Sequence, residues 1–246
     1  MRRLIIADIH SNLEALSAVA EDARGLYDEI ICCGDVVGYG ASPNQVIEWA
    51  RAHCVAIVRG NHDRACAAGG GMADFNERAG AAVLWTRERL EEGNREWLAA
   101  LSMGPSLYED YELAHGSPLD EDEYLILSYD IAPLGGVIMR PVCFVGHTHV
   151  QSGEEWTRRC LRQLSPPAAG ETERVIQLSG ERMYLFNPGS VGQPRDHDPR
   201  AAYALWDTEQ RTISLRRVEY DIHSAQRRIL DAGLHPWLAE RLALGR

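Results

Sequence analysis

Polar side chains of the kinds that bind metal ions follow several short apolar runs of the sequence. Asp8 and His10 come directly after the run "RLIIA", and Asp35 follows "EIICC". A third run, "CVAIV", precedes Asn61 and His62 in the stretch "GNHD". Carboxylates, a carboxamide and imidazoles form a mixed oxygen and nitrogen donor set, which suits Mn²⁺, Fe, Zn²⁺, Ni²⁺ or Co²⁺ better than Ca²⁺ or Mg²⁺. The pattern predicts a transition-metal site.

Two later stretches carry the same pattern. "LAHG" delivers His115, and "FVGHTH" delivers His147 and His149. Each residue alone has an ordinary explanation, because a lone Asp before a helix is usually a cap and a lone His in a strand is usually a hydrogen-bonded core residue. Taken together, these explanations would require each of many polar side chains to find its own partner, because burying a polar group without one is costly. In an extended chain the two members of D-x-H or H-x-H point to the same side, so both can reach one site.

The apolar runs before these side chains are predicted to be β-strands that alternate with helices. Ser11 and Glu14 have the spacing of a capping box at the start of the first helix, and Pro43 suits the first position of the second. Alternation of this kind implies parallel pairing, with helices covering the sheet. The carboxyl ends of the strands then line one edge, where residues distant in sequence converge.

The chain of 246 residues is predicted to form a single domain, residues 1–246, with additions at its surface. We expect an inserted helical pair at about 72–101, a surface excursion or hairpin at about 152–182, and a C-terminal helical segment at about 224–245. The runs "VCFVG", "MYLFN", "AAYALWD" and "ISLRRVEY" read as strands of a mixed or antiparallel sheet packed on the first sheet.

Composition narrows the classes of function. The formal net charge of -11 argues against a broad nucleic-acid surface, which would need a basic face. No apolar run has the length of a membrane span and the first residues do not resemble a signal peptide, so we expect a cytoplasmic protein with no membrane partner. Four of the six cysteines lie inside strand-like runs, which indicates reduced core thiols: Cys32, Cys33, Cys54 and Cys143.

The series D-x-H, G-D-x-x-G, G-N-H-D, H-G and G-H-T-H resembles the calcineurin-like metallophosphoesterases. The stretches "GDVVGYG", "WTRE" and "NPGSVGQPRD" are similar, more narrowly, to the small prokaryotic phosphodiesterase branch of that superfamily. The resemblance runs from Leu4 to about Tyr220. It implies an α/β fold of the four-layer α/β/β/α sandwich type and two divalent transition-metal ions, with Mn²⁺ favoured over Fe, Zn²⁺, Ni²⁺ and Co²⁺.

The resemblance also implies a ligand set for each ion. The first ion would be held by Asp8, His10, Asp35 and His149, and the second by Asp35, Asn61, His115 and His147, with Asp35 bridging. Two ions about 3.5–4 Å apart lower the pKa of a shared water, so that hydroxide is available near neutral pH for in-line attack on phosphorus.

The other residues of "GNHD" are predicted to be catalytic. His62 faces the phosphate, where it donates a proton to the leaving alkoxide or stabilises the transition state. Asp63 holds the imidazole in the useful tautomer, or alternatively caps a helix or pairs with Arg64.

The second motif departs from that of related enzymes. Protein phosphatases and dinucleoside-polyphosphate hydrolases have G-D-x-x-D-R-G, whose Arg grips the phosphate, whereas Gly38 and Tyr39 stand at those positions here. The difference disfavours a phosphoprotein phosphatase and is compatible with a monoanionic diester. Arg59, Arg195 and Tyr39 are the predicted substrate-binding residues, and backbone amides in "NPGSVG" are a further candidate for binding an anion.

These features predict a metal-dependent phosphodiesterase that acts on a small phosphate ester, as a monomer or small homo-oligomer. The first alternative is a phosphomonoesterase or a nuclease for short oligonucleotides, since the acidic balance disfavours long nucleic acid. The second alternative, from a different class, is a non-catalytic scaffold on the same fold. The complete set of ligand residues and the presence of His62 argue against the scaffold.

Overall fold

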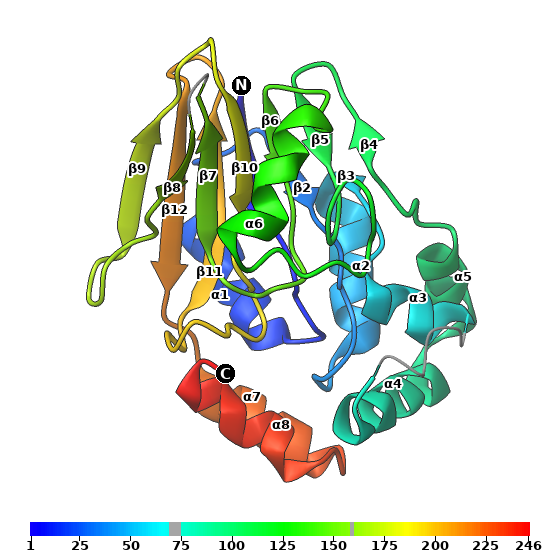
Figure 1. Cartoon of the computed structure of the whole chain (residues 1–246). Coiled ribbons are helices and arrows are strands. Elements are labelled where there is room, and N and C mark those ends of the chain that lie inside the picture. The colour runs from blue at the N-terminus through cyan, green and yellow to red at the C-terminus, as the bar shows by residue number, and fades with distance from the viewer. Residues whose placement is uncertain (69–74, 158–159) are drawn as a thin grey trace.

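The computed structural model describes residues 1–68, 75–157 and 160–246 (Figure 1). Its strands form two six-stranded sheets. The first sheet comprises, in spatial order, β3 (Cys54–Ile57), β2 (Glu29–Cys32), β1 (Arg2–Ile6), β11 (Ala201–Asp207), β12 (Thr212–Val218) and β9 (Glu173–Gln177). The second comprises β4 (Ser106–Leu107), β5 (Tyr111–Leu113), β6 (Val142–Phe144), β10 (Met183–Asn187), β7 (Ser152–Trp156) and β8 (Leu161–Leu164).

Helices lie on both outer sides of the paired sheets and at one end of them (Figure 1). They are α1 (Leu13–Asp22), α2 (Pro43–His53), α3 (Asn61–Ala68), α4 (Glu77–Arg89), α5 (Glu92–Ala99), α6 (Ser128–Ile131), α7 (Ile222–Asp231) and α8 (Pro236–Glu240), with the 3₁₀ helices η2 (Ala132–Gly136) and η3 (Arg241–Leu244).

Alternate residues of β1 and β2 pack on opposite faces of the first sheet. Leu4 and Ile6 join a core with α1 and α2, whereas Ile5 and Ile31 belong to the core between the two sheets. Burial on both faces explains why these strands read as uninterrupted apolar runs. Residues of α6 and η2 pack on the outer face of the second sheet. The layers therefore form the predicted α/β/β/α sandwich.

The pairing directions bring strand ends together. β1, β2 and β3 are parallel as predicted, and β5, β6 and β10 are parallel in the second sheet. β11 joins β1 in antiparallel register, so the first sheet is mixed. The loops that leave the carboxyl ends of the parallel strands carry the predicted metal ligands.

The first helix begins differently from the prediction. Its N-cap is Asn12, whose side chain accepts a hydrogen bond from the Ala15 amide at 3.1 Å, so Ser11 does not form the predicted capping box. Ser11 instead has a left-handed backbone with φ of 54°. Pro43 occupies the first turn of α2, as predicted.

Residues 152–182 contribute strands to both sheets: β7 and β8 pair as the predicted hairpin, but this hairpin is part of the second sheet and is not a surface excursion. β7 lies between β10 and β8 inside the second sheet, and β9 forms an edge of the first. Charged residues in β7 explain why its sequence did not indicate an inner strand. One of them, Glu155, is buried and accepts hydrogen bonds from Arg162 at 2.7 Å and from Arg182 at 2.6 Å. Such paired carboxylates remove the hydrophobic signal that normally marks an inner strand.

Two helical segments meet beyond the sheets. Helices α4 and α5 occupy the described part of 72–101, whose residues 72–74 lie outside the described residues, and α7, α8 and η3 form the C-terminal segment. Side chains of α4, α7 and α8 share a small apolar core, and Trp85 Nε1 donates to the carbonyl of Ala232 at 2.9 Å. Figure 1 shows α4, α7 and α8 at the same end of the molecule.

Within the described part of the chain, no helix has the length and apolar character needed to cross a membrane. The cysteines are free, and Cys32, Cys33 and Cys143 are fully buried, in agreement with the predicted core thiols.

Candidate metal centre

The seven predicted ligand residues converge where the strand ends of the two sheets meet. Asp8 and His10 follow β1, Asp35 follows β2, and Asn61 begins α3 directly after β3. His115 follows β5, while His147 and His149 follow β6. All of them are buried except Asn61, which is half-buried.

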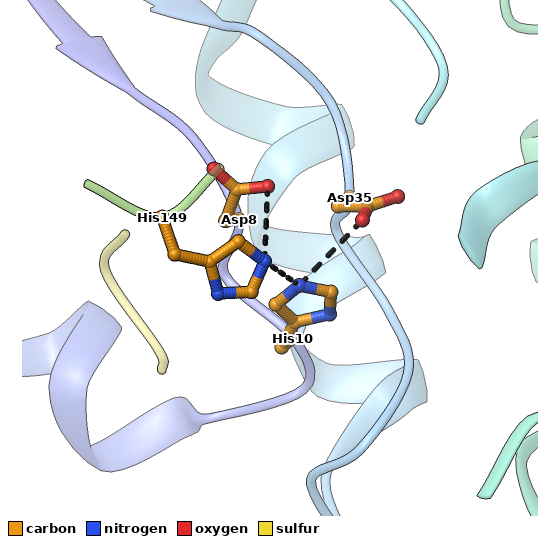
Figure 2. Close-up of side chains that lie close together, drawn as sticks. All are labelled: Asp8, His10, Asp35 and His149. Carbon is orange, nitrogen blue, oxygen red and sulfur yellow. Dashed lines mark hydrogen bonds and ion pairs between the residues drawn. The ribbon is translucent and has the colours of Figure 1, made fainter. Parts of the chain in front are cut away.

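Four of these side chains form the first cluster (Figure 2). The Nε2 atoms of His10 and His149 are 3.0 Å apart. Asp35 Oδ2 lies 3.5 Å from His10 Nε2, and Asp8 Oδ1 lies 3.5 Å from His149 Nε2. One donor atom from each residue falls within 4.8 Å of the others, which is compact enough for one ion.

The second cluster shares Asp35 with the first. Its carboxylate groups with His115 and His147 within the same 4.8 Å limit, and Asp35 Oδ2 lies 3.5 Å from His115 Nε2. Asn61 Oδ1 adds a neutral oxygen 3.3 Å from His115 Nε2 and 3.1 Å from His147 Nδ1. The structure thus brings together both ligand sets that the resemblance implied.

Backbone carbonyls fix the orientation of all four imidazoles. The outer nitrogens face the carbonyl oxygens of Val37 (His10, 2.9 Å), Cys33 (His115, 2.8 Å), Asp122 (His147, 3.2 Å) and Gln193 (His149, 2.7 Å). A carbonyl oxygen only accepts hydrogen bonds, so each outer nitrogen carries a proton. The rings of His10, His147 and His149, whose pKa values are lowered, are neutral and present a lone pair to the clusters.

The inward lone pairs fit a cation. In their neutral forms His10 and His149 direct two lone pairs at each other across 3.0 Å, an arrangement that repels unless a positive charge lies between them. Asp8 Oδ2 is buried and has no hydrogen-bond partner among the described residues. Orphaned groups of this kind are costly in a protein interior, and metal ions would satisfy them.

Burial disfavours the charged forms of these side chains and shifts their pKa values accordingly. It lowers the pKa of His10 and of His149 well below the usual value and raises the pKa of Asp8 to about 7. For His115, burial lowers the pKa, but the Asp35 charge and hydrogen bond outweigh it and raise the pKa to about 10. A bound cation would replace the proton that His115 holds beside Asp35.

Left-handed backbone conformations position the ligands. Seven non-glycine residues around the site have φ between 48° and 67°: Asp8, His10, Ser11, Asp35, Tyr39, His147 and His149. Each such residue costs about 1–2 kcal/mol, and conformations of this kind cluster at functional sites. The D-x-H and H-x-H stretches are therefore not extended, although Asp8 and His10 reach one cluster as predicted. His147 and His149 serve different clusters, which only the turn between them allows.

His62 stands beside the first cluster, and none of the described acidic residues pairs with it. Its ring centroid lies 4.8 Å from that of His10, 4.4 Å from Tyr39 and 4.7 Å from Phe75. Its Nδ1 is buried and makes no hydrogen bond to any described residue. A Cβ atom on Gly38 would lie 2.4 Å from this nitrogen, so the ring packs directly against glycine backbone. Burial lowers the pKa of His62 to about 4.

Asp63 does not orient His62, contrary to the prediction. Its Oδ1 accepts from the Val37 amide at 3.1 Å and its Oδ2 accepts from the Gly60 amide at 3.0 Å. The carboxylate therefore ties the loop after β2 to the loop after β3. The alternative ion pair with Arg64 is also wrong, because Arg64 binds acidic residues of the 121–122 stretch.

The three predicted substrate-binding residues have different surroundings. Arg59 donates two hydrogen bonds of 3.0 Å to the Glu121 carboxylate, so it is occupied by an ion pair. Arg195 donates to Gln193 Oε1 at 3.1 Å and to the Tyr39 hydroxyl at 3.4 Å, and its buried Nε has no partner among the described residues. Arg195 and Tyr39 lie at the site, whereas the guanidinium of Arg59 is paired with Glu121.

The stretch "NPGSVG" braces the site and does not present free amides to an anion. Asn187 Nδ2 donates to the Gly146 carbonyl at 2.6 Å, and Ser190 Oγ donates to the Asp8 carbonyl at 2.7 Å. The amide of Gly192 also donates to the Asp8 carbonyl, at 3.0 Å. Sequence reasoning singled out this stretch but missed its role, because the bracing depends on contacts with distant loops.

Comparison with known proteins places the chain in a family. Residues 1–211 match the model of the calcineurin-like phosphoesterase superfamily domain. The chain belongs to this superfamily. An uncharacterized protein of Methanocaldococcus jannaschii, MJ0912, is 38% identical over 255 residues, which cover 98% of this chain and 97% of the relative.

Two solved structures are similar to this chain over its whole length. A metallophosphoesterase from Sphaerobacter thermophilus matches with a TM-score of 0.87 and 36% identity, over 100% of this chain and 99% of that one. The hypothetical protein PH1004 from Pyrococcus horikoshii matches with a TM-score of 0.78 and 22% identity, over 100% and 98%. As a calcineurin-like phosphoesterase, the protein is a member of a metal-binding family of phosphoric ester hydrolases.

Proposed function

We propose that this calcineurin-like phosphoesterase is a phosphodiesterase that works with two divalent transition-metal ions, Mn²⁺ being favoured. The observation that carries the proposal is the pair of clusters joined at Asp35, in which backbone carbonyls hold four imidazoles with one ring nitrogen toward the clusters. The donor set contains nitrogen and oxygen atoms and no cysteine, which favours a catalytic site over a closed structural zinc site.

Each ion has a defined set of ligands in the proposal. Asp8, His10, Asp35 and His149 would hold one ion, and Asp35, Asn61, His115 and His147 would hold the other. Bound ions of this kind supply a nucleophile at neutral pH and offset the charge on the phosphate oxygens in the transition state.

His62 acts on the substrate from the first turn of α3. Its backbone amide donates to Asp35 Oδ1 at 2.9 Å, which fixes the start of the helix against the shared ligand. Since burial lowers the pKa of His62 to about 4, the ring is neutral at pH 7 before substrate binds. It donates an N–H to the phosphate or to the leaving oxygen, and the negative phosphate favours its protonation.

Arg195 supports a diester over a monoester as substrate. It is a single guanidinium at the site, braced by Gln193 and Tyr39, and the usual Arg position of the second motif holds Tyr39. One fixed cation matches the single charge of a phosphodiester better than the double charge of a monoester. The substrate in the proposal is a small phosphate ester and not long nucleic acid, in keeping with the net charge of -11.

The test compares a diester with a monoester on Mn²⁺-loaded protein. We expect bis-p-nitrophenyl phosphate to be hydrolysed with higher kcat/KM than p-nitrophenyl phosphate, and activity to disappear on chelation. His62→Asn should lower kcat by about 10²-fold or more. The matched control is His53→Asn, which changes an exposed histidine on α2 that stacks on Trp49 and belongs to neither metal cluster.

Three outcomes would reject parts of the proposal. Faster turnover of the monoester would favour the phosphomonoesterase alternative. Full activity in His62→Asn would remove the role given to His62. Absence of turnover of either ester by protein shown to hold two ions would favour the non-catalytic scaffold.

A further inference from the structure

A cavity lies beside the metal centre, between α4 and the C-terminal segment. It has a volume of about 250 Å³, and its lining includes Tyr39, Asn76, Arg78, Trp237 and Arg241. Tyr39 forms the wall between the two sites, because its ring also contacts His10 at 4.8 Å and His62 at 4.4 Å. The cavity is therefore separated from the first metal cluster by the width of one side chain.

Arg241 of η3 reaches this cavity and has no Asp or Glu partner among the described residues. Its guanidinium carbon lies 5.9 Å from the centroid of the Tyr39 ring and 5.8 Å from that of Trp237. Its Nε donates to the main-chain oxygen of Arg246, the last residue of the sequence, and no Asp or Glu side chain of the described residues forms an ion pair with it. Arg78 of α4 approaches the same Trp237 ring, at 5.5 Å.

Positive charge accumulates around the Tyr39 ring. The guanidinium carbon of Arg195 lies 5.7 Å from its centroid, close to the 5.9 Å of Arg241. Burial and, to a smaller extent, the charge of Arg195 lower the pKa of Arg241 to about 10. A half-buried arginine beside another arginine is costly without an anion, and no Asp or Glu side chain of the described residues supplies one to Arg241.

We propose that the cavity binds a second anionic group of the substrate, a phosphate carried by one of the two ester substituents. The inference rests on the proposed function, since the scissile phosphate must lie on the metal clusters for its substituent to pass Tyr39. Arg241 and Arg78 then hold the second phosphate through charge-assisted hydrogen bonds, while Arg195 stays with the scissile phosphate. The preferred substrate class is a phosphodiester with a neighbouring phosphomonoester.

One residue that lines the cavity carries a negative charge. Glu77, the first residue of α4, is exposed and also lines the cavity. Its carboxylate repels a second phosphate, so its removal should strengthen binding, whereas removal of Arg241 should weaken it. Variants at Glu77 and at Arg241 should therefore change the binding of the second phosphate in opposite directions.

The experiment uses two chromogenic diesters that differ in one phosphate. They are thymidine 5′-(p-nitrophenyl phosphate) and its derivative with an added 3′-phosphate, assayed with Mn²⁺-loaded protein. For the unsubstituted chain we expect the phosphorylated compound to have the higher kcat/KM. Arg241→Gln should lower the ratio of the two kcat/KM values about tenfold, and Glu77→Gln should raise it. The matched control is Arg227→Gln on α7, an exposed arginine outside the cavity that should leave the ratio unchanged.

Binding measurements separate failure of this inference from failure of the proposed function. Calorimetry of Mn²⁺-loaded protein should give tighter binding of thymidine 3′,5′-bisphosphate than of thymidine 5′-monophosphate, with the difference reduced in Arg241→Gln and Arg78→Gln. If neither diester is hydrolysed but this difference is found, the anion subsite stands and the proposed reaction does not. If the diesters are hydrolysed and the ratio is the same in Arg241→Gln as in the control, the subsite is wrong.

Discussion

The Nε2 atoms of His10 and His149 lie 3.0 Å apart, and the other nitrogen of each ring faces a backbone carbonyl oxygen. Two neutral imidazoles held in this way cannot form a hydrogen bond with each other, because both protons are committed outward. The relationship makes the first cluster well suited to hold a cation. It also determines which single variants should remove one ion and keep the other.

The first prediction concerns metal content and stability. Mn²⁺-loaded protein should hold two ions per chain, and His149→Ala should hold about one, since His149 serves only the first cluster. Metal should raise the melting temperature, because an ion at 1,000 times its Kd stabilises the folded state by about 4 kcal/mol. Elemental analysis and calorimetry measure both quantities, with His53→Ala as control. Two retained ions in His149→Ala would show that the ligand assignment is wrong.

The second prediction concerns pH. The pKa of His62 is lowered to about 4 by burial, from an ordinary value of 6.5, so between these values the unfolded chain binds more protons at this residue than the folded chain. The free energy of unfolding therefore falls as pH decreases from about 6.5 to about 4, by up to about 1.4 kcal/mol per pH unit from this group. Urea titrations of metal-free protein should show a shallower decrease in His62→Asn. Equal slopes in both proteins would contradict the buried, neutral state of the ring.

The third prediction concerns the glycine beneath His62. An added Cβ at Gly38 would lie 2.4 Å from His62 Nδ1, and the φ of 98° at this position is strained for any other residue. Gly38→Ala should displace the ring and lower kcat by about tenfold or more while both ions remain bound. Gly93→Ala in α5 is the control, because a Cβ there meets no atom within 4 Å. Kinetics and elemental analysis together distinguish a displaced His62 from a lost metal.

The fourth prediction concerns Asp63, which joins two loops through the amides of Val37 and Gly60. Asp63→Asn keeps one acceptor oxygen and loses the other, so one buried amide is left unpaired at a cost of about 1–3 kcal/mol. Urea unfolding should show this loss of stability. A variant with unchanged stability and an altered pH profile of kcat would instead restore the original hypothesis that Asp63 orients His62.

The ligand set was predictable because its signals are local. An apolar run buried on both faces followed by Asp, Asn or His is visible in the sequence, and parallel strands bring such ends to one edge. Asp8 and His115 could be placed at the centre in this way. Family resemblance then divided the seven residues between two ions, and the structure brings both sets together.

The errors concern side chains whose partners are distant in sequence. Asp63 lies beside His62 in the chain, but the loop geometry points its carboxylate to Val37 and Gly60. Glu155 reads as a surface charge, but two arginines neutralise it inside a sheet. Such contacts depend on the packing of loops and strand pairs, which hydrophobic periodicity does not encode.

The last prediction separates the two arginines that the sequence could not distinguish. Glu121 binds Arg59 through two hydrogen bonds of 3.0 Å, whereas Arg195 has no acidic partner among the described residues and lies against Tyr39 at the metal centre. A charge-assisted hydrogen bond to phosphate is worth about 1.5–3 kcal/mol, so Arg195→Gln should lower kcat/KM for bis-p-nitrophenyl phosphate by about 10-fold or more. Arg59→Gln should change kcat/KM by less than about threefold and should lower the urea midpoint, since it leaves the buried Glu121 with one cation fewer. If Arg59→Gln lost activity and Arg195→Gln kept it, the phosphate would be held on the Glu121 side of the site and the proposed orientation of substrate would be reversed.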